Sequence, residues 1–538
     1  MKRSIRIIAA CVMLAASAAV SHAQSNSFKL GQWTEIQNSI VRHLARFYVD
    51  SLPAETMYKA AIDAMLEKLD PYTVYVPESE QEDFEMMISN TYGGIGAIIY
   101  KPDKDGYVII NEPYENSPAA RAGIQCGDEI MEIDGVTSVG LDASQASSRM
   151  KGKAGTEVVF KIKKVRSGEI VEYRIKREKI HLPDVQYYGI LDDGQTGYIY
   201  QTGFTDAVSE EVRKAVLELK SKGMKRLVLD LRGNGGGLMD EAIKIVSLFV
   251  PKGTLVVSSK GSDGVKEYRT ESDPIDLKLP LMVLVDSGSA SASEIVSGAI
   301  QDLDRGVIAG RRTYGKGLVQ RVMPVAYNGQ LKVTTSKYYT PSGRCVQAKD
   351  YSHRAEDGSV GNIPDSLIRE FKTAKGRTVK DGGGITPDID VPSETVNRIS
   401  YAAVAGGLAN NWPIEFVRRH DSIPAVEDFH LSDEEYMNFV EWGAKEAFDI
   451  RSESETYYDM LVKQLKKDGD YEAAADALAA LEKVVKMEKK EALERNMEVL
   501  KPVLEEEIAV RYYYQAAGIR IRLRTDKQLK TALELWKD

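Results

Sequence analysis

The feature that most constrains the fold is an apolar run that leads directly into a turn of small residues. Residues 280–285 (Pro-Leu-Met-Val-Leu-Val) predict a buried strand, and residues 295–302 carry apolar residues at helical spacing. Residues 286–294 (Asp-Ser-Gly-Ser-Ala-Ser-Ala-Ser-Glu) form the turn between them. Unpaired N–H groups at a helix start attract negative charge, so a serine placed here can attack a carbonyl while adjacent amides hold the resulting oxyanion. The alternative is an ordinary helix cap, for which small residues are common.

The amino terminus has the pattern of an export signal. Cationic residues near the start precede an apolar run over residues 7–20, and Ser-His-Ala at 21–23 is a small-x-small cleavage site. This pattern predicts a signal peptide at residues 1–23 and a periplasmic or otherwise exported mature chain. An uncleaved anchor is the alternative, although the run is short for crossing a bilayer. We expect no integral membrane segment after signal cleavage.

Length, charge and cysteine content restrict the remaining classes. A chain of 538 residues is expected to hold about two to four domains. The formal net charge of −9 argues against a nucleic-acid partner, which usually requires a basic face. Cys126 and Cys345 remain after the signal, and the sequence offers no support for a disulfide between them and no Cys/His metal spacing. We therefore expect neither a metal nor a cofactor.

Periodicity divides the rest of the chain into four regions. Residues 24–90 predict a helical packing module with two helices separated by Pro53. Residues 91–182 are rich in glycine and strand-like runs, residues 183–393 alternate strand and helix, and residues 394–538 form a helical tail.

The helical tail has no grouped catalytic residue types. Pro502 is expected to interrupt one of its helices. Its charge runs predict solvated faces, and its apolar stripe predicts a bundle or a partner surface. The helical regions are therefore candidate contacts for a homo-oligomer or an adaptor, and we expect the tail to be separable from any chemistry in the core.

The glycine-rich region has a recognisable segment. Residues 117–124 (Ser-Pro-Ala-Ala-Arg-Ala-Gly-Ile), followed by Gly-Asp-Glu-Ile at 127–130 and Ile-Asp-Gly at 133–135, resemble a PDZ domain. In such domains a glycine-rich loop offers backbone N–H groups to the terminal carboxylate of a peptide, which adds a strand beside it. The loop residues that match are Gly93, Gly94, Ile95 and Gly96. A small β-domain whose glycines serve only turns is the alternative.

The α/β region holds the serine turn and a glycine run. Residues 197–200 and 226–231 predict strands, and residues 206–222 and 238–249 predict helices. The glycine run at 232–237 (Arg-Gly-Asn-Gly-Gly-Gly) lacks the Gly-Lys-Ser/Thr ending of a phosphate loop, which argues against a nucleotide site.

A nucleophilic serine needs a base, and lysine is the favoured candidate. Lys316 is flanked by glycines within residues 314–320 (Tyr-Gly-Lys-Gly-Leu-Val-Gln). The five histidines after the signal all lie outside the serine and glycine segments, so a Ser-His-Asp triad is not favoured. A lysine can act as the base when burial lowers its pKa enough for it to be neutral at working pH. A solvated surface lysine is the alternative.

These segments together resemble the C-terminal processing peptidases, also called tail-specific proteases. The resemblance covers about residues 31–392 and rests on the PDZ segment and on motifs at 69–72, 230–237, 288–294, 314–317, 337–344 and 384–389. Tyr314 stands where phenylalanine is commoner in the family. The resemblance implies a multidomain α/β fold: an α/β serine-peptidase core with an inserted PDZ domain, an N-terminal helical region and a C-terminal helical extension.

The resemblance also implies roles for individual residues. In the family the nucleophile lies 25 positions before the catalytic lysine, which selects Ser291 over Ser289 and Ser293. Lys316 is then the general base and Gln320 positions it. The oxyanion hole is formed by the N–H of Ala292 with that of Gly235 or Gly236. Glu294 and Asp302 also match family positions, and we interpret them as structural groups.

Two functions are compatible with this sequence. The first is an exported Ser/Lys endopeptidase that cleaves protein or peptide substrates chosen by their free C-termini. The second is a catalytically silent periplasmic binding or scaffold protein that uses the PDZ and helical modules. The presence of Ser291, Lys316 and Gln320 favours the peptidase. An acyl-CoA enzyme on a related fold would need a CoA phosphate site, and the sequence contains no candidate for one.

Overall fold

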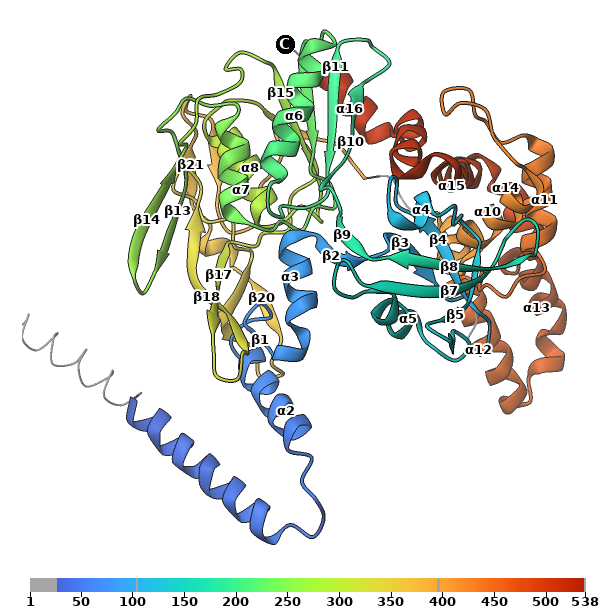
Figure 1. The fold of residues 1–538 in the computed structure, drawn as a ribbon, viewed down its shortest axis with the longest axis horizontal. Helices are drawn as coiled ribbons and strands as arrows, with labels where there is room; N and C mark the ends of the chain where they lie inside the picture. The colour runs from blue at the N-terminus through green and yellow to red at the C-terminus, as the bar shows by residue number, and fades with distance from the viewer. Residues whose placement is uncertain (1–26, 103–104, 394–396, 537–538) are drawn as a thin grey trace, which may run out of the picture. The chain divides into compact units, whose positions relative to one another are not determined.

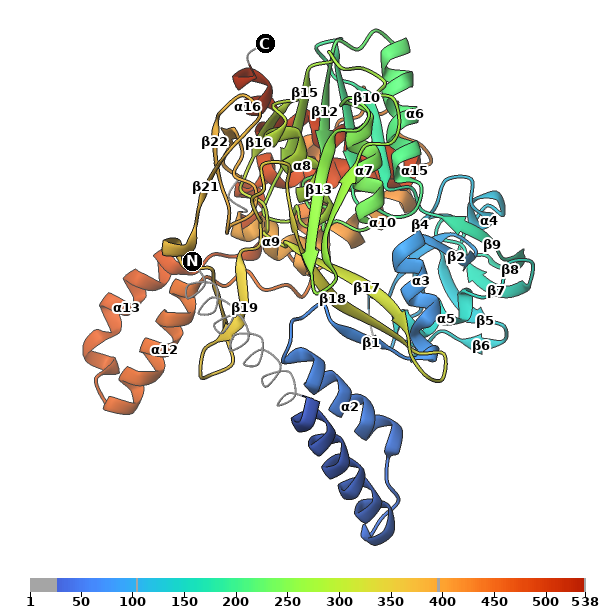
Figure 2. The same cartoon turned by 90° about the vertical axis from the view of Figure 1, so that its left-hand side faces the viewer.

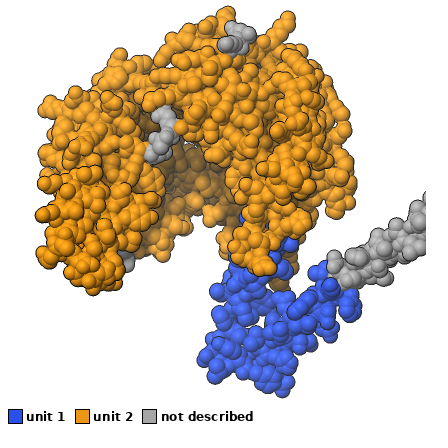
Figure 3. Space-filling model, turned by 180° about the vertical axis from the view of Figure 1, so that it is seen from behind, with its two compact units in different colours: residues 1–75 blue, residues 76–538 orange. Residues whose placement is uncertain are grey.

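The structure is a computed structural model that describes residues 27–102, 105–393 and 397–536 (Figure 1). The chain divides into two compact units, residues 1–75 and residues 76–538 (Figure 3). The predicted signal peptide, residues 1–23, lies outside the described residues.

The first unit contains the two predicted helices. One covers residues 27–47, and α2 (Ala54–Glu67) begins directly after Pro53. The second helix is predicted to end at Pro71, and α2 ends shortly before it; the chain turns at Asp70, whose carboxylate accepts the N–H groups of Tyr72 at 2.8 Å and Thr73 at 2.9 Å. The apolar face of the first helix is not buried: Trp33 is 67% exposed and Phe47 is 68% exposed. Leu66, on the apolar face of α2, is buried, and the packing role expected of residues 24–90 stays a prediction.

The second unit begins with short elements that lead into the PDZ-like region. Strand β1 (Val74–Val76) spans the boundary between the units and is followed by η1 (Glu78–Glu80) and α3 (Gln81–Ser89). Strand β2 (Thr91–Gly94) then pairs with β9 (Glu178–His181) and closes the base of the region.

The PDZ-like region is a curled antiparallel sheet with two helices. Its strands lie in the order β3-β4-β5-β7-β8, with β6 paired to β5. They are β3 (Ala97–Tyr100), β4 (Val108–Pro113), β5 (Glu129–Ile133), β6 (Val136–Thr137), β7 (Glu157–Lys163) and β8 (Ile170–Lys176). The helices are α4 (Pro118–Arg121) and α5 (Ala143–Met150). Ile110, Ile130 and Phe160 lie at the centre of its core, which confirms the strands predicted around them.

A six-stranded sheet forms the centre of the peptidase-like core. Its order is β10-β11-β12-β15-β16-β23; β10 is antiparallel to β11 and the other neighbours are parallel. The strands are β10 (Val185–Ile190), β11 (Thr196–Gln201), β12 (Arg226–Asp230), β15 (Leu281–Val285), β16 (Val307–Gly310) and β23 (Ile389–Asp390). The connecting helices are α6 (Val208–Ser221), α7 (Met239–Ser247) and α8 (Ala292–Asp302). The α/β order predicted from the sequence is confirmed.

The two faces of this sheet are covered by different parts of the chain. Leu227, Leu229 and Val283 pack into one core with α6, α7 and α8. The alternate residues of the same strands, such as Val228 and Met282, point to the opposite face, since successive side chains of a strand alternate. That face is covered by Leu529, Ala532 and Trp536 of α16 (Lys527–Leu535) and the residue after it (Figures 1 and 2).

This packing joins the tail to the core, while the separability of the tail from catalysis stays a prediction. The strands β12 and β15 are buried on both faces, as their uninterrupted apolar runs require. The tail supplies one of the two covering layers, so it is part of the core's own packing.

Smaller sheets flank the core. Strand β13 (Leu255–Gly261) pairs with β14 (Gly264–Arg269) and with β18 (Gln330–Tyr339), and β18 also pairs with β17 (Leu318–Pro324). Two short hairpins and a 3-10 turn follow: β19 (Lys349–Arg354), β20 (Val360–Asn362), η2 (Asp365–Leu367), β21 (Glu370–Lys372) and β22 (Thr378–Lys380).

The tail is helical, as predicted. Its helices before α16 are α9 (Arg398–Ala405), α10 (Leu408–Arg419), α11 (Asp433–Gly443), α12 (Glu453–Asp468), α13 (Tyr471–Val485), α14 (Lys489–Arg495) and α15 (Met497–Thr525). The prediction that Pro502 interrupts a helix is wrong: α15 runs through it, with the loss of one backbone hydrogen bond near its start. The break lies at Tyr514, where φ is 66°.

Two further observations concern the whole chain. Cys126 and Cys345 are both free thiols, so they do not form a disulfide with each other. Within the described ranges, none of the helices combines the length and the apolar character needed to cross a membrane.

Candidate active site

Ser291 lies where strand β15 turns into helix α8, at the position that the sequence predicts. It is the residue immediately before Ala292, the first residue of α8. Its φ is 56°, a backbone conformation that costs a non-glycine residue on the order of 1–3 kcal/mol. The side chain is half-buried rather than enclosed. A strained turn of this kind projects a hydroxyl from the end of a strand towards a bound molecule.

The structure distinguishes the three candidate serines of the turn, Ser289, Ser291 and Ser293. Ser289 and Ser293 are fully buried, and their hydroxyls donate to backbone carbonyls of the glycine loop, Ser289 to Leu231 at 2.7 Å and Ser293 to Asn234 at 2.9 Å. Both hydroxyls therefore hold the turn against the loop. Ser291 is the most accessible of the three candidates; the fourth serine of the turn, Ser287, is exposed and is not one of them.

The glycine loop packs directly against Ser291. A side chain on Gly236 would place its Cβ 2.6 Å from the carbonyl oxygen of Ala290 and 2.8 Å from the Cβ of Ser291. Only a glycine allows this approach. The loop between β12 and α7 thus lines the serine with backbone rather than with side chains.

The loop and the helix start present different backbone donors. The N–H of Gly236 donates to the side-chain oxygen of Asn234 at 2.9 Å. For the N–H groups of Gly235 and Ala292, we find no acceptor in the part of the chain that the structure describes. Of the two glycines predicted for the oxyanion hole, Gly235 is therefore the one whose N–H is not donated to another described residue, and the oxyanion hole itself stays a prediction.

Glu294 joins the serine turn to the lysine loop. One carboxylate oxygen accepts the N–H groups of Ser291 and Lys316, each at 2.9 Å. The other accepts the N–H of Gly315 at 2.7 Å and the hydroxyl of Thr313 at 2.6 Å. Burial raises the pKa of Glu294, and these hydrogen bonds lower it in part. The carboxylate fixes the backbones of the predicted nucleophile and the predicted base to each other.

Lys316 and Gln320 lie at the start of the β17–β18 hairpin. Lys316 is half-buried between Gly315 and Gly317, directly before β17. The amide of Gln320 donates to the hydroxyl of Thr334 on β18 at 3.1 Å. The positioning of Lys316 by Gln320 stays a prediction.

Tyr338 supports the serine turn from the other side, a role that the sequence analysis missed. Its ring is fully buried, and its hydroxyl donates to the carbonyl oxygen of Ser291 at 3.2 Å. The residue lies in the motif at 337–344, which gave the only signal that could have found it.

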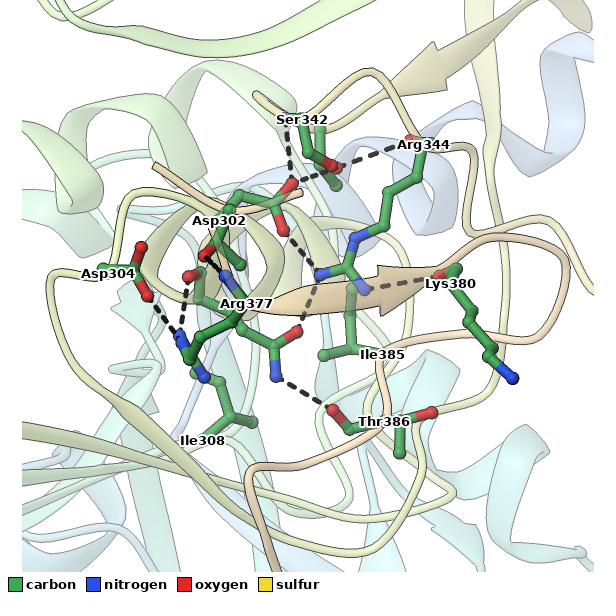
Figure 4. Close-up of polar contacts among 12 residues, drawn as sticks. Asp302, Asp304, Ile308, Ser342, Arg344, Arg377, Lys380, Ile385 and Thr386 are labelled. Atoms are coloured by element: carbon green, nitrogen blue, oxygen red, sulfur yellow. Dashed lines mark hydrogen bonds and ion pairs between the residues drawn. The ribbon is translucent and has the colours of Figure 1, made fainter. Parts of the chain in front are cut away.

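The far end of α8 is anchored by buried charges (Figure 4). The carboxylate of Asp302 accepts the N–H of Ser342 at 3.0 Å and pairs with the guanidinium of Arg344 at 2.8 Å. Arg344 also donates to Gln301 at 2.7 Å, and Gln301 donates to the carbonyl of Thr386 at 2.9 Å. The motifs at 337–344 and 384–389 thus hold the helix whose other end carries Ser291, which agrees with a structural role for Asp302.

A groove lies between β3 and α5 of the PDZ-like region. It has a volume of about 370 Å³ and is lined by Gly94, Ile95 and Gly96, by β3 and by α5. Gly96 has φ of 74°, and a Cβ there would lie 2.5 Å from the Cβ of Ser117. Gly93 and Gly94 are part of β2, where they pair with Lys179 and Glu178, so the loop itself is shorter than predicted.

Comparisons with known proteins match the same three regions. The model of Peptidase family S41 matches residues 195–357, which hold Ser291 and Lys316. The PDZ domain model matches residues 109–164. A model described as "Probable PDZ-protease, C-terminal helical domain" matches residues 399–536.

Similar proteins carry consistent names. A "Probable CtpA-like serine protease" of Staphylococcus aureus (strain COL) is 34% identical over 329 residues, which are 61% of this chain and 64% of that protein. A protein of the same name from Staphylococcus haemolyticus (strain JCSC1435) is 34% identical over 380 residues, 70% of this chain and 74% of that protein. The chain therefore spans slightly less than two thirds of the first of these relatives.

Among solved structures, the photosystem II D1 C-terminal processing protease is 25% identical, with 68% of this chain and 88% of that chain covered and a TM-score of 0.38. The family model covers the serine and lysine segments, and the Staphylococcus haemolyticus relative is matched over most of its length. The chain belongs to peptidase family S41, among the C-terminal processing peptidases.

Proposed function

We propose that this protein is an exported serine endopeptidase that uses a Ser291–Lys316 dyad and selects protein substrates by their C-terminal tails. The observation that carries the proposal is the serine turn. Of the three candidate serines, Ser289 and Ser293 are buried with their hydroxyls bonded to the glycine loop, and Ser291 stands half-buried beside backbone donors. Glu294 holds the lysine loop against the same turn.

The proposed reaction is acyl transfer. The Ser291 hydroxyl attacks the peptide carbonyl carbon while neutral Lys316 takes its proton, and the carbonyl oxygen becomes an oxyanion. The N–H groups of Ala292 and Gly235 donate to that oxyanion, and such preorganised donors are a large part of the catalysis in acyl transfer. Protonated Lys316 then returns the proton to the leaving amine. Water releases the acyl group from Ser291 in the second half-reaction.

Substrate choice is assigned to the PDZ-like groove. A peptide that lies along β3 can add a strand to the sheet, and its terminal carboxylate then meets the backbone N–H groups near Ile95 and Gly96. Hydrogen bonds to a charged carboxylate are stronger than those to a neutral group. The signal-like pattern at residues 1–23 supports action outside the cytoplasm.

The central test is the loss of cleavage in Ser291→Ala. We expect this variant to retain its fold and to hydrolyse an unfolded protein substrate no faster than background. Ser289→Ala and Ser293→Ala should keep activity and lose about 1 kcal/mol of stability each, because their hydroxyls make structural bonds. Lys316→Arg should also be inactive, since a guanidinium does not deprotonate in proteins. The exposed Lys337→Arg serves as its control. Cleavage by Ser291→Ala at the parent rate would contradict the assignment of Ser291 as the nucleophile.

The role of the groove is tested with two peptides that differ only at the C-terminus. We expect the free acid to bind more tightly than the amide by about 1.5–3 kcal/mol, the value of a hydrogen bond to a charged group. Isothermal titration with the parent measures this difference. The same comparison with Gly96→Ala, which crowds Ser117, should show a smaller difference. Equal affinity of the parent for both peptides would rule out reading of the carboxylate.

A further inference from the structure

The start of helix α16 is bound to the glycine loop through Arg232. The guanidinium of Arg232 lies between two carboxylates. Its Nε donates to both oxygens of Asp230 at 3.0 Å, and its Nη2 donates to Asp230 at 2.6 Å. Its Nη1 donates to Asp526 at 3.2 Å, and its Nη2 to the other oxygen of Asp526 at 2.5 Å. Gln528 accepts a further bond from Nη1 at 3.0 Å.

These groups are largely removed from solvent. The side chain of Arg232 is 18% exposed, that of Asp526 is 11% exposed and that of Asp230 is fully buried. Asp526 is also the N-cap of α16, where it accepts the N–H of Leu529 at 2.7 Å. Gln528 is tied back to the core by a bond to the carbonyl of Val391 at 3.1 Å. A buried, bidentate ion pair with this support has a fixed geometry.

Arg232 and the buried Asn234 are the two side chains that precede the three glycines of the loop, and the Asn234 amide donates to the carbonyl of Gln201 at 3.0 Å. Gly233 follows Arg232 and donates its N–H to Asp286 of the serine turn at 2.9 Å. Asn234 comes next, and its carbonyl accepts the N–H of Ala290 at 3.0 Å. Gly235, Gly236 and Gly237 then lack side chains that could fix their peptide planes. The direction of the Gly235 N–H is therefore determined by the anchored residues on either side of the glycines.

We propose that Asp526 and Arg232 are positioning residues for the oxyanion hole, so that α16 is a working part of the peptidase site. Asp526 holds the guanidinium of Arg232, and the held arginine fixes the start of the loop that aims the Gly235 N–H. Neither residue touches the substrate. This inference rests on the proposed function, because it assigns a purpose to the donor that the proposed reaction uses.

The test is Asp526→Asn, measured with an unfolded protein substrate and with a peptide p-nitrophenyl ester. Asparagine is as good an N-cap as aspartate, so this change removes the ion pair while α16 keeps its cap. The burst of the ester counts the active sites in each preparation. We expect kcat per titrated site to fall about tenfold or more for both substrates, because both pass through an oxyanion, while KM changes by less than about twofold. Asp526→Glu, which keeps the carboxylate, should recover most of kcat.

A matched control and a second variant complete the design. Glu534→Gln makes the same chemical change at an exposed position of α16 and should leave kcat per site unchanged. If Asp526→Asn does not fold, Arg232→Lys keeps the charge, loses the planar fork and should give the same fall in kcat per site. An unchanged kcat per site, a fall only in the number of titrated sites, or a rise in KM alone would each overturn the inference.

The result is distinguishable from a failure of the proposed function. Activity that depends on Ser291 but not on Asp526 would overturn this inference alone. Activity that persists in Ser291→Ala would overturn the proposed function, whatever Asp526→Asn does.

Discussion

At the scale of single residues, Glu294 has the most demanding role in the site. Its carboxylate accepts four hydrogen bonds, two of them from the backbones of Ser291 and Lys316. Four donors pointing at one group require the ionised form, although burial raises its pKa. Glu294 therefore fixes the backbones of the proposed nucleophile and the proposed base relative to each other.

We predict that Glu294→Gln lowers both stability and activity. The amide nitrogen of glutamine must face donors, and each buried donor that it leaves unsatisfied costs about 1–3 kcal/mol. Denaturant unfolding should show a lower midpoint, and kcat should fall because Ser291 and Lys316 are no longer tied to one acceptor. Glu210→Gln, on the exposed first turn of α6, is the control. A variant with parent stability would show that Glu294 is protonated in the folded protein.

Sequence analysis identified the candidate nucleophile and base more readily than the residues that hold them in position. The spacing to Lys316 selected Ser291, and the structure gives the buried Ser289 and Ser293 other bonds. Glu294 was interpreted as a helix-start group, which it is, but its bonds to the lysine loop depend on a fold that sequence spacing does not reveal. Tyr338 lies in the motif at 337–344, but its bond to Ser291 depends on the fold, and Asp526 carries no local signal because its partner lies far away in the chain.

At the scale of elements, strand β4 meets helix α15 through a buried carboxyl group. Glu112 accepts a hydrogen bond from Gln515, and the neighbouring Asn111 accepts one from Arg511 at 3.2 Å. Burial raises the pKa of Glu112 to about 7, against the opposing effects of Gln515 and Arg511. The PDZ-like region is thus joined to the tail through a group that titrates near neutrality.

This arrangement predicts a stability that falls with rising pH. An unfolded glutamate loses its proton near pH 4.3, whereas Glu112 keeps it until about pH 7, so the folded form binds more protons between these values. The contribution is complete below the lower value and is lost as pH rises through the upper one. We expect Glu112→Gln to remove a pH-dependent difference on the order of 3 kcal/mol in urea unfolding between pH 4.5 and pH 8.

The control for this prediction is Glu115→Gln, an exposed glutamate three positions along the chain. It should keep the parent's pH dependence. The same slope in both variants would show that another group is responsible.

Sequence patterns identified the elements of the core better than those of its flanks. The apolar runs at β12 and β15 and the 3.6-residue period of α6 are strong local signals. Strand β14 is mostly exposed and β18 is half-buried along most of its length, so neither shows a clear alternation. The prediction that Pro502 interrupts a helix is wrong because a proline near the start of a long helix removes only one hydrogen bond.

At the scale of the whole molecule, helix α16 of the tail covers one face of the central sheet. We predict that a chain ending at Thr525 loses activity and binds a dye for exposed apolar surface. Each large side chain removed from the sheet face costs about 1.5–3 kcal/mol of burial. Leu529→Ser should reproduce part of this loss, whereas Leu535→Ser should not, because Leu529 is 3% exposed and Leu535 is 48% exposed. A stable and active chain ending at Thr525 would show that α16 is not needed for folding or catalysis.

The pairing of tail and sheet could not be predicted from local pattern. The amphipathic stripe of α16 is compatible with a bundle, a partner or a sheet, and the sequence does not distinguish these surfaces. The choice depends on a contact between segments separated by more than two hundred residues, for which a single sequence carries no direct signal.

The bond between Arg232 and Asp526 has a consequence for the order of events during synthesis. The two residues are 294 positions apart, so the proposed nucleophile Ser291 and the glycine loop are synthesised long before Asp526. A chain that emerges from its amino terminus then passes through a stage with Ser291 and Lys316 present and the sheet still open on one side. On the proposed positioning role, the chain reaches its full activity only after residues 526–536 have packed against the sheet and Asp526 has bound Arg232.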